Sequence, residues 1–126
     1  MISFEDLVLD EESPIYQQII RYVKRGIVSG SIKDGEEMLS RRALSVLLGV
    51  NPNTIQKAYH LLEEEGIIVS RSGARSCVEV NVDRIFQIRM SLIRQDTAGW
   101  VQAMKQMGVS QEEAILVATG LWEEKG

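Results

Sequence analysis

Two helix-forming segments separated by a short turn constrain the fold of this chain most strongly. Residues 41–48 carry apolar side chains at helical spacing, and Gly49 ends the segment because glycine adopts positive φ at little steric cost. Asn51-Pro52 starts the next helix, since asparagine caps helix N-termini and proline tolerates the first helical position. The pattern therefore predicts two helices joined by a turn of three residues, with Val50 bridging it.

A longer helix is predicted ahead of this pair. Ser13-Pro14 provides a start of the same kind, with Ser13 as the expected cap, and the helix should end near Gly30. Its apolar stripe is Ile15, Ile19, Ile20, Val23 and Ile27. We expect a turn at Lys33-Asp34-Gly35. Residues 1–12 are acidic and weakly patterned, so we expect an extended or frayed arm there.

Each helix of the pair has an inner and an outer face. In the first, Ser40 is the expected cap, and the side chains expected to face inward are Ala43, Leu44, Leu47 and Leu48. In the second, the predicted buried side consists of Ile55, Ala58, Tyr59 and Leu62. The side chains left pointing outward are Asn53, Thr54, Gln56, Lys57 and His60.

A β-hairpin is predicted after the third helix. Gly66 closes that helix, and residues 67–71 are rich in β-branched side chains, which favours a strand. Residues 72–74 form the expected turn, and residues 77–80 form the expected returning strand. Three helices followed by a hairpin are the element order of a winged helix-turn-helix. The predicted fold class is therefore mainly α with a small β-hairpin, and we place this domain in residues 1–80.

The remaining residues, 81–126, are expected to form a short segment of two or three helices. Gly99 is expected to break or kink it, Gly108 to end its first part, and Ser110 with Glu113 to form a capping box for the last helix. This segment holds more apolar side chains than it can bury against itself, and large exposed apolar patches are rare on monomers. We therefore expect a homodimer; packing of the segment onto its own winged helix is the alternative. The predicted interface residues are Ile85, Phe86, Arg89, Leu92, Ile93, Trp100, Met104, Leu116 and Trp122.

The distribution of charge favours DNA as a partner, although the net charge is −4. Affinity for DNA comes largely from Lys and Arg, so the net charge alone argues against it. Residues 38–62, however, contain no acid and carry Arg41, Arg42 and Lys57, and residues 66–78 contain no acid and carry Arg71 and Arg75. These two windows can present one surface to phosphates.

The outward face of the third helix has side chains that read base edges. Asparagine and glutamine pair with adenine in the major groove, threonine serves base edges or phosphate, and lysine serves guanine or phosphate. Asn53, Thr54, Gln56 and Lys57 lie in the first two turns, where recognition helices make base contacts. We also expect the backbone N–H groups at this acid-free helix start to be offered to phosphate. In the hairpin, Arg71 and Arg75 could reach phosphates or the minor groove.

Residues 14–80 resemble the GntR family of bacterial regulators. The family pattern Pro-Ile-Tyr-Gln-Gln occurs at residues 14–18, and the match continues through Leu-Gly-Val-Asn-Pro-Asn-Thr-Ile-Gln-Lys-Ala-Tyr at 48–59 and Leu-Glu-Glu-Glu-Gly-Ile-Ile at 62–68. The Asn-Pro-Asn-Thr form is typical of the YtrA subfamily. The resemblance implies a C-terminal segment that mainly dimerises and is too small for a roomy ligand pocket. It also suggests repression, often of transporter operons.

Together, the residues and the resemblance predict one set of DNA contacts. The resemblance implies that Arg42 contacts phosphate or base at the start of the second helix. The predicted DNA-binding residues are Ser40, Arg41, Arg42, Asn51, Pro52, Asn53, Thr54, Gln56, Lys57, Arg71, Gly73 and Arg75. A homodimer would match a pseudo-palindromic operator with half-sites about 10 bp or a multiple apart.

The sequence departs from the family pattern at three places. Leu39 stands where proline is usual, and Ala43 stands where an acid is usual. The family hairpin reads Arg-x-Gly-x-Gly-Thr-Phe-Val, and here Arg75 replaces the second glycine and Cys77 the aromatic residue. Arg75 either adds a phosphate contact or replaces a close backbone approach, and both readings stay open.

Enzyme activity is not expected. The chain has one histidine, His60, and one cysteine, Cys77, with no catalytic set, no glycine loop for phosphate and no metal-spaced cluster, so we predict no cofactor and no metal site. Glu63 to Glu65 are interpreted as a solvated helix end, and the methionines and tryptophans as ordinary core. No apolar run approaches the length of a membrane span, and a single cysteine suits a reducing compartment, so we expect a cytoplasmic protein. The alternative function is a winged-helix module that binds protein without specific DNA binding, against which the acid-free third helix argues. Whether a small effector exists stays open.

Overall fold

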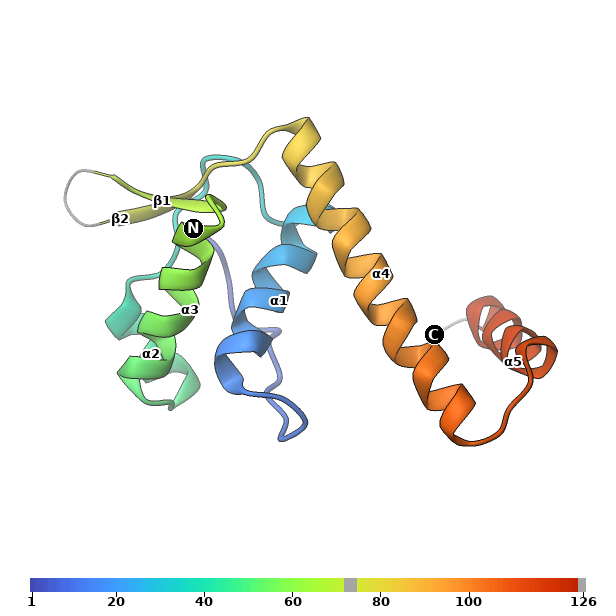
Figure 1. The fold of residues 1–126 in the computed structure, drawn as a ribbon. Helices are drawn as coiled ribbons and strands as arrows, with labels where there is room; N and C mark the ends of the chain where they lie inside the picture. Colours follow the sequence, from blue (N-terminus) through green and yellow to red (C-terminus); the bar gives the residue numbers. More distant parts are fainter. Residues whose placement is uncertain (72–74, 125–126) are drawn as a thin grey trace. The chain divides into compact units, whose positions relative to one another are not determined.

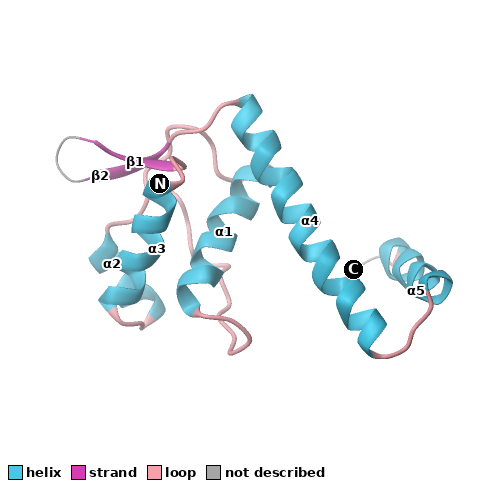
Figure 2. Ribbon diagram, in the orientation of Figure 1, coloured by secondary structure: helices cyan, strands magenta, loops and turns pink. Residues whose placement is uncertain are grey.

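The computed structural model describes residues 1–71 and 75–124, which form five helices and one two-stranded antiparallel sheet. In chain order these are α1 (Ile15–Ser29), α2 (Arg41–Leu48), α3 (Pro52–Glu64), β1 (Ile68–Arg71), β2 (Arg75–Val78), α4 (Val82–Gln106) and α5 (Gln111–Glu123) (Figure 1). Helices dominate, and the hairpin is the one sheet in the described residues (Figure 2). The predicted fold class is confirmed. The chain divides into two compact units, Met1–Arg89 and Met90–Gly126, which are described separately.

Helix α1 begins where the sequence predicts, but Ser13 does not cap it. Pro14 is the N-cap, with no side-chain hydrogen bond, and its carbonyl accepts from the N–H groups of Gln17 and Gln18. The carbonyl of Ser13 instead accepts from the side-chain amide of Gln18 at 2.7 Å. Gly30, at φ 88°, ends the helix as predicted.

Helices α2 and α3 have the predicted caps and the predicted turn. The Ser40 hydroxyl accepts from the Ala43 N–H at 3.1 Å, and the Asn51 side-chain oxygen accepts from the Asn53 N–H at 2.8 Å. Gly49 is left-handed at φ 66°. The Ser45 hydroxyl donates to the Val50 carbonyl at 2.7 Å, and the Val50 N–H donates to the Ser45 carbonyl, so the turn is held from both sides.

The inner face of α2 differs from the prediction. Leu44 is fully buried and Leu48 is half-buried, but Ala43 and Leu47 are exposed, so their expected inward orientation is wrong. Ser45 is buried instead. The physical reason is helical geometry: Leu44, Ser45 and Leu48 share one arc of the helix, and Ala43 and Leu47 lie outside that arc.

The core of the first unit lies between α1 and α3. Ile19, Val23 and Ile27 of α1 are buried, while Ile15 and Ile20 of the predicted stripe are half-buried. The predicted inner side of α3 is confirmed, since all four of its residues, Ile55, Ala58, Tyr59 and Leu62, are buried. Burying apolar side chains on both helices stabilises their packing, at about 25 cal/mol for each Å² removed from water.

The N-terminal arm is extended but not frayed. Ile2 and Phe4 are buried, and the Phe4 ring lies 5.2 Å from the Tyr22 ring of α1. The side-chain amide of Gln18 accepts from the backbone N–H of Asp10 and donates to the backbone carbonyl of Asp10. Of the two predicted states, extended or frayed, the frayed one is therefore wrong, because the buried Ile2 and Phe4 anchor the arm to the core.

The hairpin starts its second strand earlier than predicted. Strand β2 covers Arg75–Val78 rather than 77–80, because the register pairs Ile68 with Val78 and Arg71 with Arg75. The predicted turn, Ser72-Gly73-Ala74, lies outside the described residues. On the other edge of β2, Glu37 forms an isolated bridge with Cys77, and the turn at residues 33–36 is present as predicted.

The C-terminal helices are two in the described residues. Gly99 lies inside α4 and does not end it, so the expected break is absent; Gly108, at φ 72°, follows the helix as predicted. The Ser110 hydroxyl accepts from the Glu113 N–H at 3.2 Å and caps α5. Within the second unit most apolar side chains are exposed, including Leu116 at 73% and Trp122 at 90%.

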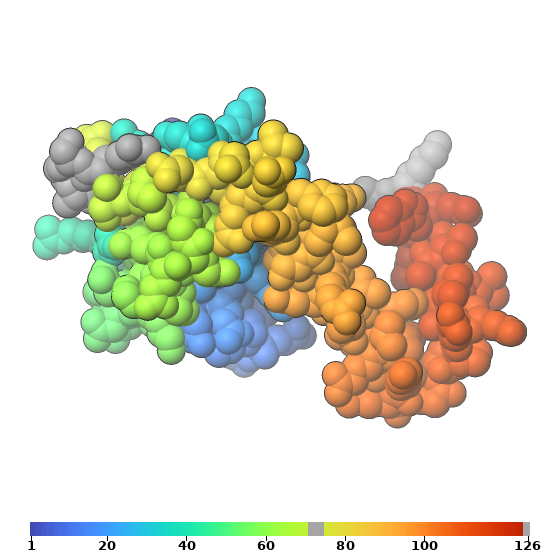
Figure 3. All heavy atoms as spheres, turned by 45° about the horizontal axis from the view of Figure 1, so that its top comes forward, coloured from blue at the N-terminus to red at the C-terminus, as the bar shows by residue number. Residues whose placement is uncertain are grey.

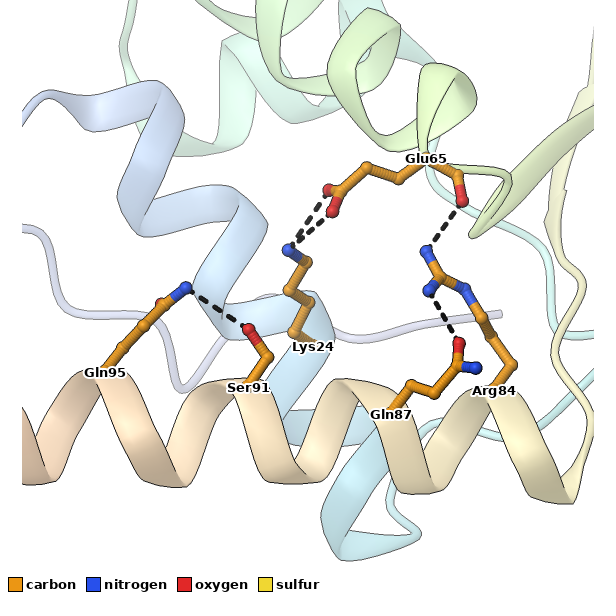
Figure 4. A network of polar contacts seen from close by, with 6 residues as sticks. All are labelled: Lys24, Glu65, Arg84, Gln87, Ser91 and Gln95. Carbon is orange, nitrogen blue, oxygen red and sulfur yellow. Dashed lines mark hydrogen bonds and ion pairs between the residues drawn. The ribbon is translucent and has the colours of Figure 1, made fainter.

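The C-terminal end of α3 is tied to α1 and to the first turns of α4 (Figure 4). The Glu65 carboxylate pairs with the Lys24 ammonium at 3.1 Å. The Glu65 backbone carbonyl accepts from the Arg84 guanidinium at 2.7 Å, and Arg84 also donates to Gln87. These contacts hold the C-terminal end of α3 in place, so that the first turns of the helix have a defined position in the unit.

Candidate nucleic-acid interface

The first turns of α3 present a polar surface without acids. Asn53, Gln56 and Lys57 are exposed, as predicted, and Thr54 is half-buried. No acidic residue lies in the first turn. Atoms of α3 reach the surface of the first unit in the space-filling view (Figure 3). Amide side chains can donate and accept at once, so this surface has the chemistry that reads base edges.

The backbone at the start of α3 contributes less than expected. Pro52 has no N–H, the Asn53 N–H donates to the Asn51 side chain, and the Thr54 N–H donates to the Asn51 carbonyl at 3.0 Å. The expectation that these N–H groups are offered to phosphate is therefore wrong for this conformation. Because Asn51 already satisfies them, contacts from this end of the helix fall to the side chains.

The two arginines at the start of α2 have different roles. The Arg42 side chain is exposed and has no hydrogen-bond or ion-pair partner among the residues that the structure describes. Arg41 is half-buried, pairs with Glu63 of α3, and has its guanidinium carbon 4.9 Å from the centre of the Tyr59 ring. Arg41 therefore joins α2 to α3, whereas Arg42 has its charge available to solvent.

Tyr59 fixes the segment that enters α2. Its hydroxyl donates to the Leu39 carbonyl at 2.6 Å. Burial raises the pKa of the Tyr59 hydroxyl above its ordinary value, and the neighbouring Arg41 charge offsets only part of that increase. The hydroxyl thus stays protonated as a donor, which holds Ser40 and Arg42 close to α3.

Lys57 is positioned by a residue that the sequence did not point to. Its ammonium nitrogen lies 4.1 Å from the centre of the Tyr16 ring of α1, a cation–π contact. The Tyr16 hydroxyl in turn accepts from the Gln17 side-chain amide at 3.2 Å. The start of α1 thereby comes next to the exposed face of α3.

The hairpin of β1 and β2, called the wing from here on, carries Arg75, which is 68% exposed and pairs with Glu37. Both Glu37 carboxylate oxygens lie 3.0 Å from the same guanidinium nitrogen. The register places Arg71 opposite Arg75, and only the backbone of Arg71 is described. Gly73, also predicted to bind DNA, lies outside the described residues. The sequence pointed to Arg75 but not to Glu37.

The three glutamates at the C-terminal end of α3, Glu63 to Glu65, each have a basic side chain within reach. Glu63 pairs with Arg41, Glu65 pairs with Lys24, and the Glu64 carboxylate lies 2.9 Å from the His60 ring. Glu64 and Glu65 are exposed, as the interpretation of this run as a solvated helix end predicts, whereas Glu63 is half-buried against Arg41.

The residues predicted for a dimer interface are mostly exposed. Phe86 and Arg89 are exposed and Ile85 is half-buried in the first unit. In the second unit Ile93, Trp100, Leu116 and Trp122 are exposed, and Met104 is half-buried. Leu92 is already buried within the single chain, which leaves little of it for a partner.

Other kinds of site are not formed by the described residues. Among residues 1–71 and 75–124, no three His, Cys, Asp or Glu side chains lie together in a way that could hold a metal ion. No helix in that part of the chain has the length and apolar character to cross a membrane.

Comparison with known proteins gives a consistent set of relatives. The family model for bacterial regulatory proteins of the gntR family matches residues 15–78. The HTH-type transcriptional repressor YtrA of Bacillus subtilis is 32% identical over 102 residues, which cover 80% of this chain and 78% of that protein. None of these descriptions names an enzyme.

Two solved structures are also similar. A GntR family transcriptional regulator from Listeria monocytogenes superposes with a TM-score of 0.76 at 35% identity, covering 89% of this chain and 98% of the other. YtrA from Sulfolobus acidocaldarius, described as a GntR-family transcription factor, gives a TM-score of 0.56 at 35% identity, covering 75% of this chain and 99% of the other.

Proposed function

Because the chain belongs to the GntR family of bacterial regulatory proteins, and within it to the YtrA subfamily, we propose that it represses transcription by binding a pseudo-palindromic operator as a homodimer. Its family membership makes it a DNA-binding transcriptional regulator. Repression, the symmetric site and the dimer are the further steps of the proposal, and each has its own support.

The observation that carries DNA reading is the start of α3. Asn53 and Gln56 are exposed there, the first turn of the helix contains no acid, and Asn51 accepts from the backbone N–H groups of Asn53 and Thr54. The amides therefore remain for base edges in the major groove. Arg42 and Lys57 would contact the phosphates that flank these bases. The other residues proposed to contact DNA are Ser40, Arg41, Pro52, Thr54, Arg71, Gly73 and Arg75.

The observation that supports a dimer is the exposed apolar surface of the second unit. Leu116 is 73% and Trp122 is 90% exposed in the single chain, and large exposed apolar surfaces are uncommon on monomers. A groove along α4 is lined by Met90, Ile93 and Val101 together with Arg94 and Lys105. We propose that residues 1–80 bind DNA and that residues 81–126 pair two copies.

Repression is supported by YtrA of Bacillus subtilis, a relative that is named as a repressor. A dimer bound across a promoter would block access of the polymerase. Two recognition helices related by a two-fold axis would contact half-sites about 10 bp or a multiple apart.

Footprinting tests the proposal. The purified protein is bound at low salt to the DNA upstream of its own gene, followed by gel shift and then by nuclease protection. We expect a protected region with two-fold symmetry, and binding that weakens steeply as salt rises because phosphate contacts release counterions. Protection without symmetry contradicts the dimeric operator, and no retardation at low salt supports a module that binds protein instead.

A reporter fused to the protected promoter tests the direction of regulation. We expect deletion of the regulator to raise reporter expression, and Gln56→Ala to raise it as the deletion does. Reduced expression after deletion would identify an activator and contradict the repressor assignment.

A further inference from the structure

Glu37 is held in a fixed position beside the wing. Its backbone bridges to Cys77 of β2, and its neighbours are bonded to the same strand through Met38 N–H to the Ser76 carbonyl and Val78 N–H to the Glu36 carbonyl. The Glu37 carbonyl accepts from the Ile2 N–H at 2.9 Å. The carboxylate therefore starts from a backbone that is fixed on both sides.

This geometry brings an acid to a wing whose own sequence has none. Residues 66–78 contain no acidic residue, yet both oxygens of Glu37 lie 3.0 Å from one guanidinium nitrogen of Arg75. The Glu37 side chain is 34% exposed and that of Arg75 is 68% exposed, so the pair faces solvent and is open to competition. A phosphate that contacts Arg75 must displace this carboxylate or lie next to it.

We propose that Glu37 restrains Arg75 and weakens the hold of the wing on phosphate, which leaves sequence discrimination to α3. The inference rests on the proposed DNA binding and adds a residue that tunes its specificity. Whether the phosphate displaces the Glu37 carboxylate or lies next to it, the affinity for DNA falls equally for all sequences, because phosphate contacts carry no direct base information. A weaker wing raises the share of the binding energy that comes from base contacts.

Four variants test the inference: Glu37→Gln, Arg75→Ala, the double variant, and Glu36→Gln as the matched control. The Glu36 carboxylate accepts from the Lys33 N–H instead of pairing with Arg75, and glutamine keeps that acceptor. Binding of the footprinted duplex and of a scrambled duplex of the same length is measured by fluorescence anisotropy over a range of salt. Circular dichroism melts confirm that each variant is folded.

We expect Glu37→Gln to tighten binding to both duplexes severalfold, up to about fivefold, since exposed pairs of this kind are weak. The slope of log K against log salt should steepen by about 0.9 if Arg75 gains one phosphate. Glu36→Gln should raise the affinity for DNA less than Glu37→Gln does. In the Arg75→Ala background, Glu37→Gln should raise the affinity by no more than Glu36→Gln does in the wild-type protein.

Several results would overturn the inference. One is an equal gain in DNA affinity from Glu36→Gln and Glu37→Gln, and another is a gain that persists in the double variant. A third is weaker DNA binding by Glu37→Gln, which would mean that Glu37 holds Arg75 in a position that favours binding. In each of these the wild-type protein still binds DNA and the proposed function stands. If the wild-type protein binds neither duplex at low salt, the proposed function fails and the inference fails with it.

Discussion

The ammonium of Lys57 on α3 lies over the ring of Tyr16 on α1, 4.1 Å from its centre. The contact joins two helices that pack through their buried faces and extends their association to the surface. It also limits the positions that the Lys57 side chain can take beside Asn53 and Gln56.

This relationship predicts an energetic coupling between the two residues. In a double-mutant cycle of Tyr16→Leu and Lys57→Met, we expect a coupling of about 0.5–1 kcal/mol in the free energy of unfolding. Tyr16→Phe should keep most of it, because the ring remains. Urea denaturation followed by circular dichroism measures these values. Purely additive effects would show that the contact contributes nothing in solution.

The two kinds of DNA contact should separate by mutation. Arg42→Ala should weaken binding to specific and random duplexes alike and lower the salt slope by about 0.9, because one phosphate contact is lost. Gln56→Ala should instead lose about 1–3 kcal/mol of discrimination at one base pair. Lys33→Ala, which removes an exposed charge from the turn before α2, is the control and should change both little. If Gln56→Ala affected specific and random DNA equally, the assignment of Gln56 to base reading would be wrong.

The anchored arm leads to a stability prediction. Phe4→Ala should lower the free energy of unfolding by about 3–5 kcal/mol, because a fully buried aromatic side chain is removed. Val8→Ala is the matched control in the same arm; Val8 is 85% exposed, and its loss should change stability by less than about 0.5 kcal/mol. Chemical denaturation measures both. Similar small effects at the two positions would mean that the arm is detached in solution.

Leu116 should distinguish a dimer from a monomer. Leu116→Glu places a charge on an exposed apolar position of α5, so we expect the chain to stay folded while the dimer dissociates. Glu112→Ala, which changes an exposed polar residue in the first turn of the same helix, should leave the dimer intact. Sedimentation velocity reports the mass of each variant. A Leu116→Glu chain that still sediments as a dimer would place the interface elsewhere.

The local elements could be predicted because their signals are local. Asn51, Ser40 and Ser110 cap their own helices, and Gly49 ends α2, so neighbouring residues decide each boundary. The buried side of α3 followed from its periodicity. In the eight-residue α2 the same argument misplaced Leu47, since the buried arc includes Ser45, which bonds to Val50 in the turn, and leaves Leu47 outside.

The contacts that position the site could not be predicted in this way. Tyr16 reaches Lys57, and Glu37 reaches Arg75 across 38 residues, only after the helices have packed and the wing has paired with the preceding segment. Phe4 stood in an acidic stretch with no periodicity to mark it as core. The amide surface of α3 was visible in the sequence, whereas the partners that restrain its neighbouring cations depend on the tertiary fold.

The acids at its last turn give α3 a direction. From Pro52 to Leu62 the helix has none, and then Glu63, Glu64 and Glu65 follow one another with Arg41, His60 and Lys24 as partners. A polyanion such as DNA is therefore attracted to the acid-free N-terminal end of this helix and gains no attraction at the acidic C-terminal end. In the proposed complex, α3 therefore enters the DNA groove in one orientation, with its N-terminal turns toward the bases. The same bases in reverse order would then be a different binding site for this protein.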